Sequence, residues 1–267
     1  MSSTSLTYQE KLRLFRIKQT QIKMIRARGY HISEAEISYL DADPDDFITL
    51  ISEAADDQGL SYRQMLSNVY TVEGAGRAGE DDEDEDEDED DTGRGGRDGD
   101  RGRRGRRDRG RGGRGAVNPS DKLLVKYIDV VNSIKADDIF TMTKDMDSHR
   151  AINGIIISPG KIRSDTAKRL VSYRPKYIQA FMEDKLMYDI TESVIVPAHT
   201  ALTEAELDEF VRTNDGIDIR NLPILLSSDP VSKYYDFRPG QVVRVERVNM
   251  YPTSVGVSLA YRIVMEE

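Results

Sequence analysis

Two segments near the end of the chain decide the fold of its last third: residues 241–247 (QVVRVER) and 257–265 (VSLAYRIVM). Apolar and polar residues alternate in both, which is typical of β-strands with one buried face. We therefore expect two half-buried strands. The inward-facing residues are predicted to be Val243 and Val245 in the first segment, and Val257, Leu259, Tyr261, Ile263 and Met265 in the second.

Helix start signals precede these strands. Asp229-Pro230 supplies a suitable N-cap and first residue for a short helix. Thr203 with Glu206 three residues later forms a capping box for another helix. Arg238-Pro239-Gly240 supplies the turn into the first strand. This order of elements predicts a compact mixed α/β module at the C-terminal end.

The beginning of the chain is predicted to be helical. Capping boxes at Thr7/Glu10 and Ser33/Glu36 start two helices, and Asp43-Pro44 starts a third. We expect the first helix to end at Gly29, which suits the position after a helix C-cap.

One face of the first helix is basic, which allows two interpretations. It is an ordinary solvated face, or it approaches nucleic-acid phosphates. The residues concerned are Lys11, Arg13, Arg16, Lys18, Lys23, Arg26 and Arg28.

The middle of the chain combines predicted strands with one helix. Residues 123–131 and 152–157 are expected to form strands, and residues 133–146 a helix. If a strand near Val69 pairs with the strand near Val125, the intervening segment is a long hairpin loop. Such a loop is thermodynamically tolerable, because closure entropy rises only with the logarithm of loop length.

That intervening segment has an extreme composition. Residues 80–91 are twelve consecutive acids, and residues 93–115 contain ten Arg among Gly and three Asp. Neither block has enough apolar surface to offset its ordering entropy, so both are predicted to be disordered. Two roles stay open: weak RNA binding by the Arg-Gly tract, and mutual neutralisation of the two blocks. The G-x-G-x-x-G pattern of residues 110–115 lacks the flanking strand and helix of a nucleotide site, so we interpret it as coincidence.

An ordered series of motifs resembles one protein family, the fifth subunit shared by the eukaryotic nuclear DNA-directed RNA polymerases, together with its archaeal counterpart. The residues that carry the resemblance are Val196-Pro197-Ala198-His199, Leu222-Pro223, Ser228-Asp229-Pro230-Val231, Arg238-Pro239-Gly240-Gln241-Val242-Val243 and Tyr261-Arg262-Ile263-Val264-Met265. A second series near the N-terminus, Arg28-Gly29-Tyr30 with Ile32-Ser33 and Glu36, resembles the start of the same polymerase component. Residues 62–72 resemble the first strand of its N-terminal domain, so the resemblance implies a strand there.

The resemblance implies an α/β (α+β) protein with two domains. An N-terminal nuclease-like jaw domain would comprise residues 1–73 and 120–192, interrupted by the disordered acidic and Arg-Gly insertion at residues 74–119. A C-terminal assembly domain would comprise residues 193–267. The family departs from this chain at Ser193, where it usually has His.

The function implied is that of a non-catalytic polymerase subunit, with no cofactor and no metal of its own. Its expected partners are the largest subunit, other polymerase subunits and downstream duplex DNA. The residues expected to dock on the largest subunit are Pro197, His199, Asp229, Pro230, Arg238, Gly240, Tyr261 and Arg262. The residues expected near DNA are Lys161, Arg163, Lys168 and Arg169, beside a predicted helix start at Ser164. The alternative for this cluster is an ordinary solvated surface.

A catalytic alternative rests on Asp165 and the run Glu183-Asp184-Lys185. These residues formally match the acid and E-x-K elements of a Mg²⁺-dependent nuclease. We disfavour this interpretation, because Asp165 falls in a predicted first helical turn and Glu183 at a predicted helix end. The histidines His31, His149 and His199 lack metal-ligand spacing, and His199 is expected to be a hydrogen-bonded turn residue.

Composition sets the remaining limits. The chain has no Cys, which excludes disulfides, and a net charge of −10 that averages two opposite blocks. No run is apolar enough for a membrane span, so we expect a soluble protein inside the cell. The location would be the nucleus for a cellular protein, and the virion or host cytoplasm for a protein encoded by a large DNA virus. The alternative function is a free RNA-binding or chaperone-like protein that acts through the Arg-Gly tract.

Overall fold

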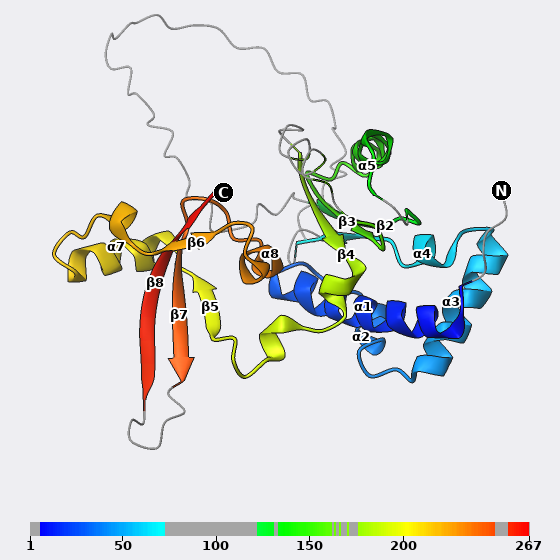
Figure 1. Ribbon diagram of the computed structural model, residues 1–267, viewed down its shortest axis with the longest axis horizontal. Coiled ribbons are helices and arrows are strands. Elements are labelled where there is room, and N and C mark those ends of the chain that lie inside the picture. Colours follow the sequence, from blue (N-terminus) through cyan, green and yellow to red (C-terminus); the bar gives the residue numbers. More distant parts are fainter. Residues whose placement is uncertain are drawn as a thin grey trace, which may run out of the picture.

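The computed structural model describes residues 6–72, 122–130, 133–161, 163, 166, 170, 176–248 and 256–266. It has a mixed α/β fold built on two four-stranded sheets, as predicted (Figure 1). The insertion predicted at residues 74–119 lies outside the described residues. Among the helices that are described, none combines the length and the apolar character that crossing a membrane requires.

The first sheet has the strand order β1-β2-β3-β4. Its strands are β1 (Asn68–Thr71), β2 (Lys122–Tyr127), β3 (Asn153–Ser158) and β4 (Tyr177–Met182). β1 pairs antiparallel with β2, with Val69 opposite Leu124. The pairings β2·β3 and β3·β4 are parallel. The predicted hairpin is therefore confirmed at its strands, although β1 is shorter than the predicted strand.

Helices cover both faces of this sheet (Figure 1). Helix α5 (Ala136–Ser148) packs on one face, against Leu124, Ile156 and Ile178. Helix α1 (Tyr8–Ala27) packs on the other, against Leu123, Val125 and Ile155. Because successive strand residues point to opposite faces, Leu123 and Leu124 belong to different cores. The result is a three-layer arrangement.

Three further helices complete the N-terminal part. They are α2 (Glu34–Ser38), α3 (Pro44–Gln58) and α4 (Tyr62–Met65). Residues 62–65, predicted as strand, are helical because Ser61 and Gln64 form a capping box. α3 begins at the predicted N-cap Asp43 and ends at Gly59, whose φ of 63° suits a helix C-terminus.

The capping boxes of the sequence are confirmed with one exception. Thr7/Glu10 and Thr203/Glu206 are complete boxes. Ser33 caps α2 as predicted, but the carboxylate of Glu36 does not return to the helix start. It is instead buried, 2.7 Å from the Lys18 ammonium. The predicted box is therefore wrong in its second half, since a buried ion pair takes the carboxylate.

The second sheet has the strand order β5-β7-β8-β6. Its strands are β5 (Ala198–Ala201), β6 (Ile224–Leu226), β7 (Val242–Val248) and β8 (Val257–Met265). Helix α8 (Pro230–Tyr235) lies at one face, where Tyr235 packs against the core cluster of Val243, Val245 and Val264. Helix α7 (Glu204–Thr213) covers the other face near Val242 and Ile263.

Short 3-10 turns connect these elements at Glu183–Leu186, Ile190–Glu192 and Ile219–Asn221. The segment from Glu183 to Ala198 links the two sheets, and α8 lies beside the C-terminal end of α1 (Figure 1).

Candidate functional site

The alternation in β7 and β8 is confirmed, but the predicted inward faces are not the same face of the sheet. The register places Val243 opposite Arg262 and Val245 opposite Ala260. Val243 and Val245 therefore share a face with Val264, which is fully buried. The set that begins with Val257 and Leu259 lies on the opposite face, which α7 covers only at its inner end.

The outer half of that second face is exposed. Leu259 is 55% accessible, and Val257 and Val248, which pair with each other, are exposed as well. In the isolated chain, Val257, Leu259 and Met265 are exposed, so the prediction that they face a core is wrong. Alternation identifies the two faces of a strand but not which face is covered.

A second group of exposed apolar residues precedes β5. Val194 is 75% exposed and Ile195 90% exposed. Because Ala198 pairs with Glu246 and the strands are antiparallel, the residues before Ala198 run toward the outer end of β7. We name Val194, Ile195, Val248, Val257 and Leu259 the apolar patch. Sequence patterns did not single out Val194 and Ile195, although two adjacent apolar residues in a linker were a visible signal.

The predicted docking residues serve several different local roles. His199 shares a hydrogen bond of 2.7 Å with the carbonyl of Pro197, as predicted, but it lies in β5 and pairs with Val245 of β7, so its predicted place in a turn is wrong. Asp229 caps α8 through Val231 N–H at 2.8 Å, with Pro230 at the first turn. Gly240 has a φ of 92°.

The other predicted docking residues are held by contacts inside the chain. Tyr261 stacks on Phe210 of α7, with the ring centroids 4.2 Å apart. Arg262 donates to the carbonyl of Ile224 at 3.0 Å. Arg238 turns toward the first sheet, where its guanidinium lies over the ring of Tyr177. Their contact with another polymerase chain stays a prediction.

Two acidic residues of the nuclease alternative, Glu183 and Asp184, form ion pairs. Glu183 is 2% exposed and accepts from Arg63 Nε at 2.7 Å. Burial opposes the charge of the Arg63 guanidinium, but hydrogen bonds to Glu183 prevail and raise its pKa. Asp184 pairs with Arg13. Asp165 lies outside the described residues, within which no group of three or more His, Asp or Glu side chains is arranged to hold a metal ion.

The basic face of α1 divides into cations that contact other elements and cations that are exposed, Arg16 and Arg26. Lys18 is 3% exposed and pairs with Glu36, while Arg28 reaches the carbonyls of α8. At the surface, Arg13 pairs with Asp184, and Lys23 with Glu192 at 2.5 Å. Ion pairs with other elements therefore neutralise three of the seven cations of this face, Arg13, Lys18 and Lys23.

The residues predicted near DNA are only partly described. Lys161 and Arg163 are exposed on the chain that follows β3, and Lys161 forms a backbone bridge with Ser133. Lys168 and Arg169 lie outside the described residues. Their convergence with Lys161 and Arg163 therefore stays a prediction.

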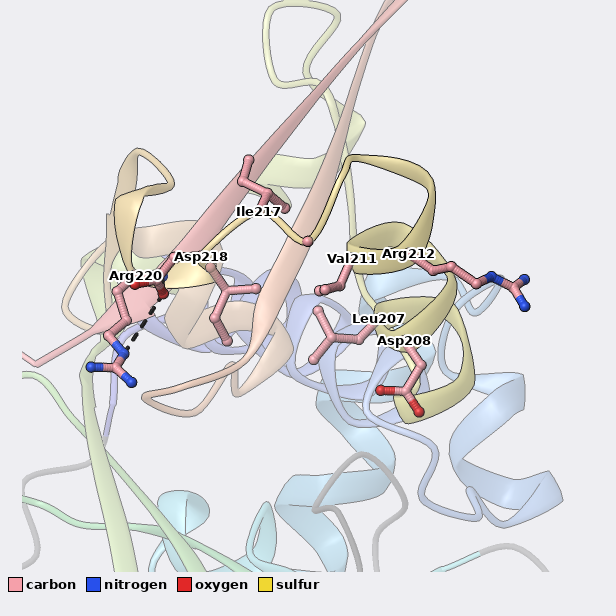
Figure 2. Close-up of a pocket in the computed structure, with 9 residues that line it drawn as sticks. Leu207, Asp208, Val211, Arg212, Ile217, Asp218 and Arg220 are labelled. Carbon is pink, nitrogen blue, oxygen red and sulfur yellow. Dashed lines mark hydrogen bonds and ion pairs between the residues drawn. The ribbon is translucent and has the colours of Figure 1, made fainter.

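A shallow groove of about 510 Å³ separates α7 from residues 216–220 (Figure 2). Leu207, Val211 and Ile217 supply apolar lining, while Asp208, Arg212, Asp218 and Arg220 supply charges of both signs. Asp218 and Arg220 pair with each other at 3.7 Å. None of the predicted site residues lines this groove.

Comparison with known proteins identifies the second sheet. Residues 188–264 match the family model described as "RNA polymerase Rpb5, C-terminal domain". The subunit Rpo5 of a DNA-directed RNA polymerase from Methanocaldococcus jannaschii is 36% identical over 77 residues, which cover 94% of that protein and 29% of this chain. The chain belongs to the Rpb5 family.

Longer relatives match a larger share of the chain. The subunit RPABC1 of DNA-directed RNA polymerases I, II and III from Caenorhabditis briggsae is 28% identical over 149 residues, which are 55% of this chain and 68% of the relative. The subunit 5-like protein 1 from Arabidopsis thaliana is 30% identical over 135 residues, which are 49% of this chain and 62% of the relative. The exposed apolar patch lies wholly inside residues 188–264, the part that matches the Rpb5 family model.

Proposed function

We propose that this chain is a non-catalytic subunit of a multisubunit DNA-directed RNA polymerase that docks on the largest subunit through its C-terminal sheet. Family membership supports the assignment to the polymerase. The apolar patch is the observation that carries the docking, because it lies on the part of the chain that matches the family. Contiguous exposed apolar side chains on a folded domain are typical of protein interfaces.

The geometry of the patch fits a protein partner. Val248 and Val257 pair across the β7·β8 hairpin, and Leu259 follows on the same face. Val194 and Ile195 precede β5, whose first residue, Ala198, pairs with Glu246 near the outer end of β7. Large apolar side chains that become desolvated at the centre of an interface contribute most of its binding energy. We therefore expect the patch to be covered when the polymerase is assembled.

The jaw role is a second part of the proposal. The sheet β1 to β4 would lie near downstream duplex DNA, with Lys161 and Arg163 among its phosphate contacts. The cellular location would be the nucleus if the gene is cellular, and the virion or host cytoplasm if it is viral.

Affinity purification of the tagged full-length chain tests the docking. We expect co-purification with two very large polymerase subunits. The double variant Val194→Asp, Ile195→Asp should reduce this recovery at least tenfold, because it places two charges in a desolvated interface. Leu50→Asp is the matched control. Leu50 is 51% exposed, but it lies on helix α3 in the N-terminal part of the chain, far from the patch in sequence.

Two results would contradict the proposal. Equal recovery with the patch variant and the control would remove the patch from the interface. Recovery of the wild-type chain without large subunits would instead favour the alternative, a free RNA-binding or chaperone-like protein that acts through the Arg-Gly tract.

A further inference from the structure

The two sheets meet at a group of polar and aromatic side chains that we name the joint: Arg28, Tyr30, Asn153, Tyr177, Gln179, Asp236 and Arg238. Arg28 is the C-cap residue of α1. Its Nε donates to the carbonyl of Tyr234 at 2.9 Å, and its terminal nitrogen donates to the carbonyl of Lys233 at 2.6 Å. Both acceptors belong to the last turn of α8, where carbonyls carry partial negative charge, and the Lys233 carbonyl also accepts from the N–H of Asp236 at 3.3 Å.

The second arginine of the joint crosses in the opposite direction. Arg238 comes from the C-terminal sheet, and its guanidinium carbon lies 3.3 Å from the ring centroid of Tyr177 on β4. Its terminal nitrogen is 2.5 Å from Asp236 and 3.4 Å from Asn153 on β3. A guanidinium that stacks on a ring while it donates to oxygens has its orientation fixed by both contacts.

Asp236 connects the two arginine contacts. It has a φ of 59° at the C-cap of α8, a conformation that L residues other than Asn and Asp rarely adopt. One carboxylate oxygen accepts from Arg238, and the other accepts from Gln179 of β4 at 3.1 Å. Burial lowers the pKa of Arg28, and the nearby Asp236 carboxylate opposes that shift.

Contacts around the joint add to its rigidity. Tyr234 is 5% exposed and packs into the core cluster of the N-terminal part. Its hydroxyl donates to Asp189 at 2.9 Å. The amide of Asn153 donates to the hydroxyl of Tyr30 at 3.1 Å, so α1, β3 and the C-terminal sheet are linked through neighbouring bonds.

We propose that the joint holds the two sheets in one fixed orientation, so that the chain acts as a rigid arm. Domains joined only by a linker move relative to each other unless a substantial interface prevents it. Here Arg28 of the N-terminal part contacts two carbonyls of α8. Arg238 of the C-terminal part contacts Tyr177 and Asn153 of the first sheet. With the proposed function, it follows that docking of the C-terminal sheet sets the position of the sheet β1 to β4.

The sequence contains no cysteine, which allows a direct test on the full-length chain. Glu53→Cys on α3 and Glu209→Cys on α7 place two spin labels at exposed sites on opposite sides of the joint. Pulsed dipolar spectroscopy then reports the distribution of distances between them. We expect a single narrow distribution for the otherwise unchanged chain.

The joint variant carries Arg28→Met and Arg238→Met in the labelled chain. Methionine keeps an unbranched, flexible side chain but removes every hydrogen-bond donor. We expect the width of the distance distribution to increase at least twofold. Arg244→Met is the matched control, because Arg244 pairs with Glu206 and Glu246 inside the C-terminal part. Its distribution should keep the wild-type width.

Circular dichroism of each variant separates loss of the joint from loss of the fold. A broad distribution in the unchanged chain would refute the rigid arm. An unchanged width in the joint variant with native circular dichroism would refute the role of the two arginines. If the joint variant unfolds, the single variant Arg238→Lys replaces it, and a width equal to that of the control would again refute the assignment. None of these outcomes depends on polymerase docking, so failure of this proposal is distinguishable from failure of the proposed function.

Discussion

The buried pair of Lys18 and Glu36 gives the sharpest prediction about stability. Lys18 Nζ lies 2.7 Å from Glu36 Oε1 and also donates to the carbonyl of Leu66 at 3.0 Å. The hydroxyl of Tyr70 donates to the same carboxylate at 2.7 Å. Burial lowers the pKa of Lys18, and the charge of Glu36 counteracts it. The pair is therefore held by mutual neutralisation inside the core.

Lys18→Met removes the cation and leaves a carboxylate that is 5% exposed with Tyr70 as its remaining donor. Breaking a buried ion pair from one side costs about 3–5 kcal/mol. The loss is large against a total stability of about 5–15 kcal/mol. With a urea dependence of about 2 kcal/mol per molar, the unfolding midpoint should fall by about 2 M.

Two further variants decide the cause of the loss. Lys18→Met with Glu36→Gln removes both charges and keeps an acceptor for Tyr70, so it should recover most of the stability. Lys23→Met is the control: Lys23 and Glu192 are paired at the surface, where their side chains are 40% and 63% exposed. Its cost should be below about 1 kcal/mol. Equal midpoints for Lys18→Met and Lys23→Met would refute the reasoning.

Three other predictions address the turn, the insertion and the DNA surface. Gly240→Val should cost about 1–3 kcal/mol in urea unfolding, because Gly240 has a φ of 92° that a β-branched residue rarely adopts; an unchanged midpoint would contradict this. Replacement of residues 76–115 by a short Gly/Ser linker should leave the melting temperature nearly unchanged, since the flanking strands pair antiparallel; loss of a cooperative transition would show that the segment stabilises the fold. Lys161→Ala with Arg163→Ala, measured in assembled polymerase, should reduce the magnitude of the salt slope for downstream duplex by about one to two, and identical slopes would exclude these two cations from the DNA path.

The parts of the fold that depend on neighbouring residues could be predicted from the sequence. Thr7, Asp43, Thr203 and Asp229 all cap the helices they were expected to start. A capping interaction spans only two or three residues, so the sequence contains all of its partners.

The covered face of a strand was not predictable in the same way. It depends on where α7 and α8 lie, and those helices approach from outside the segment. Val257 and Leu259 form an apolar stripe that looks like a core face, yet they are exposed in the isolated chain. A polymerase partner would give the same stripe a buried environment, so the pattern predicts burial without saying which chain provides it.

The joint and the buried charges had no local signal. Arg28 contacts Tyr234 across 206 residues, and Arg63 contacts Glu183 across 120. Each residue looks like a surface cation in its own segment. These pairs form only when the two sheets are assembled, so the hydrophobic periodicity of each segment does not predict them. The contact of Lys161 and Arg163 with DNA stays a prediction.

The contacts of α1 with residues far along the chain also constrain when this helix can complete its packing during synthesis. This helix, Tyr8–Ala27, precedes its surface partner Asp184 and its end partners Lys233 and Tyr234 by more than a hundred residues, so they are synthesised later. The parallel pairing of β3 with β4 likewise waits for Met182. Contacts of such large sequence separation form slowly and leave apolar surface open meanwhile. The contacts that end α1 and pair its surface can therefore form only after these later segments have been synthesised.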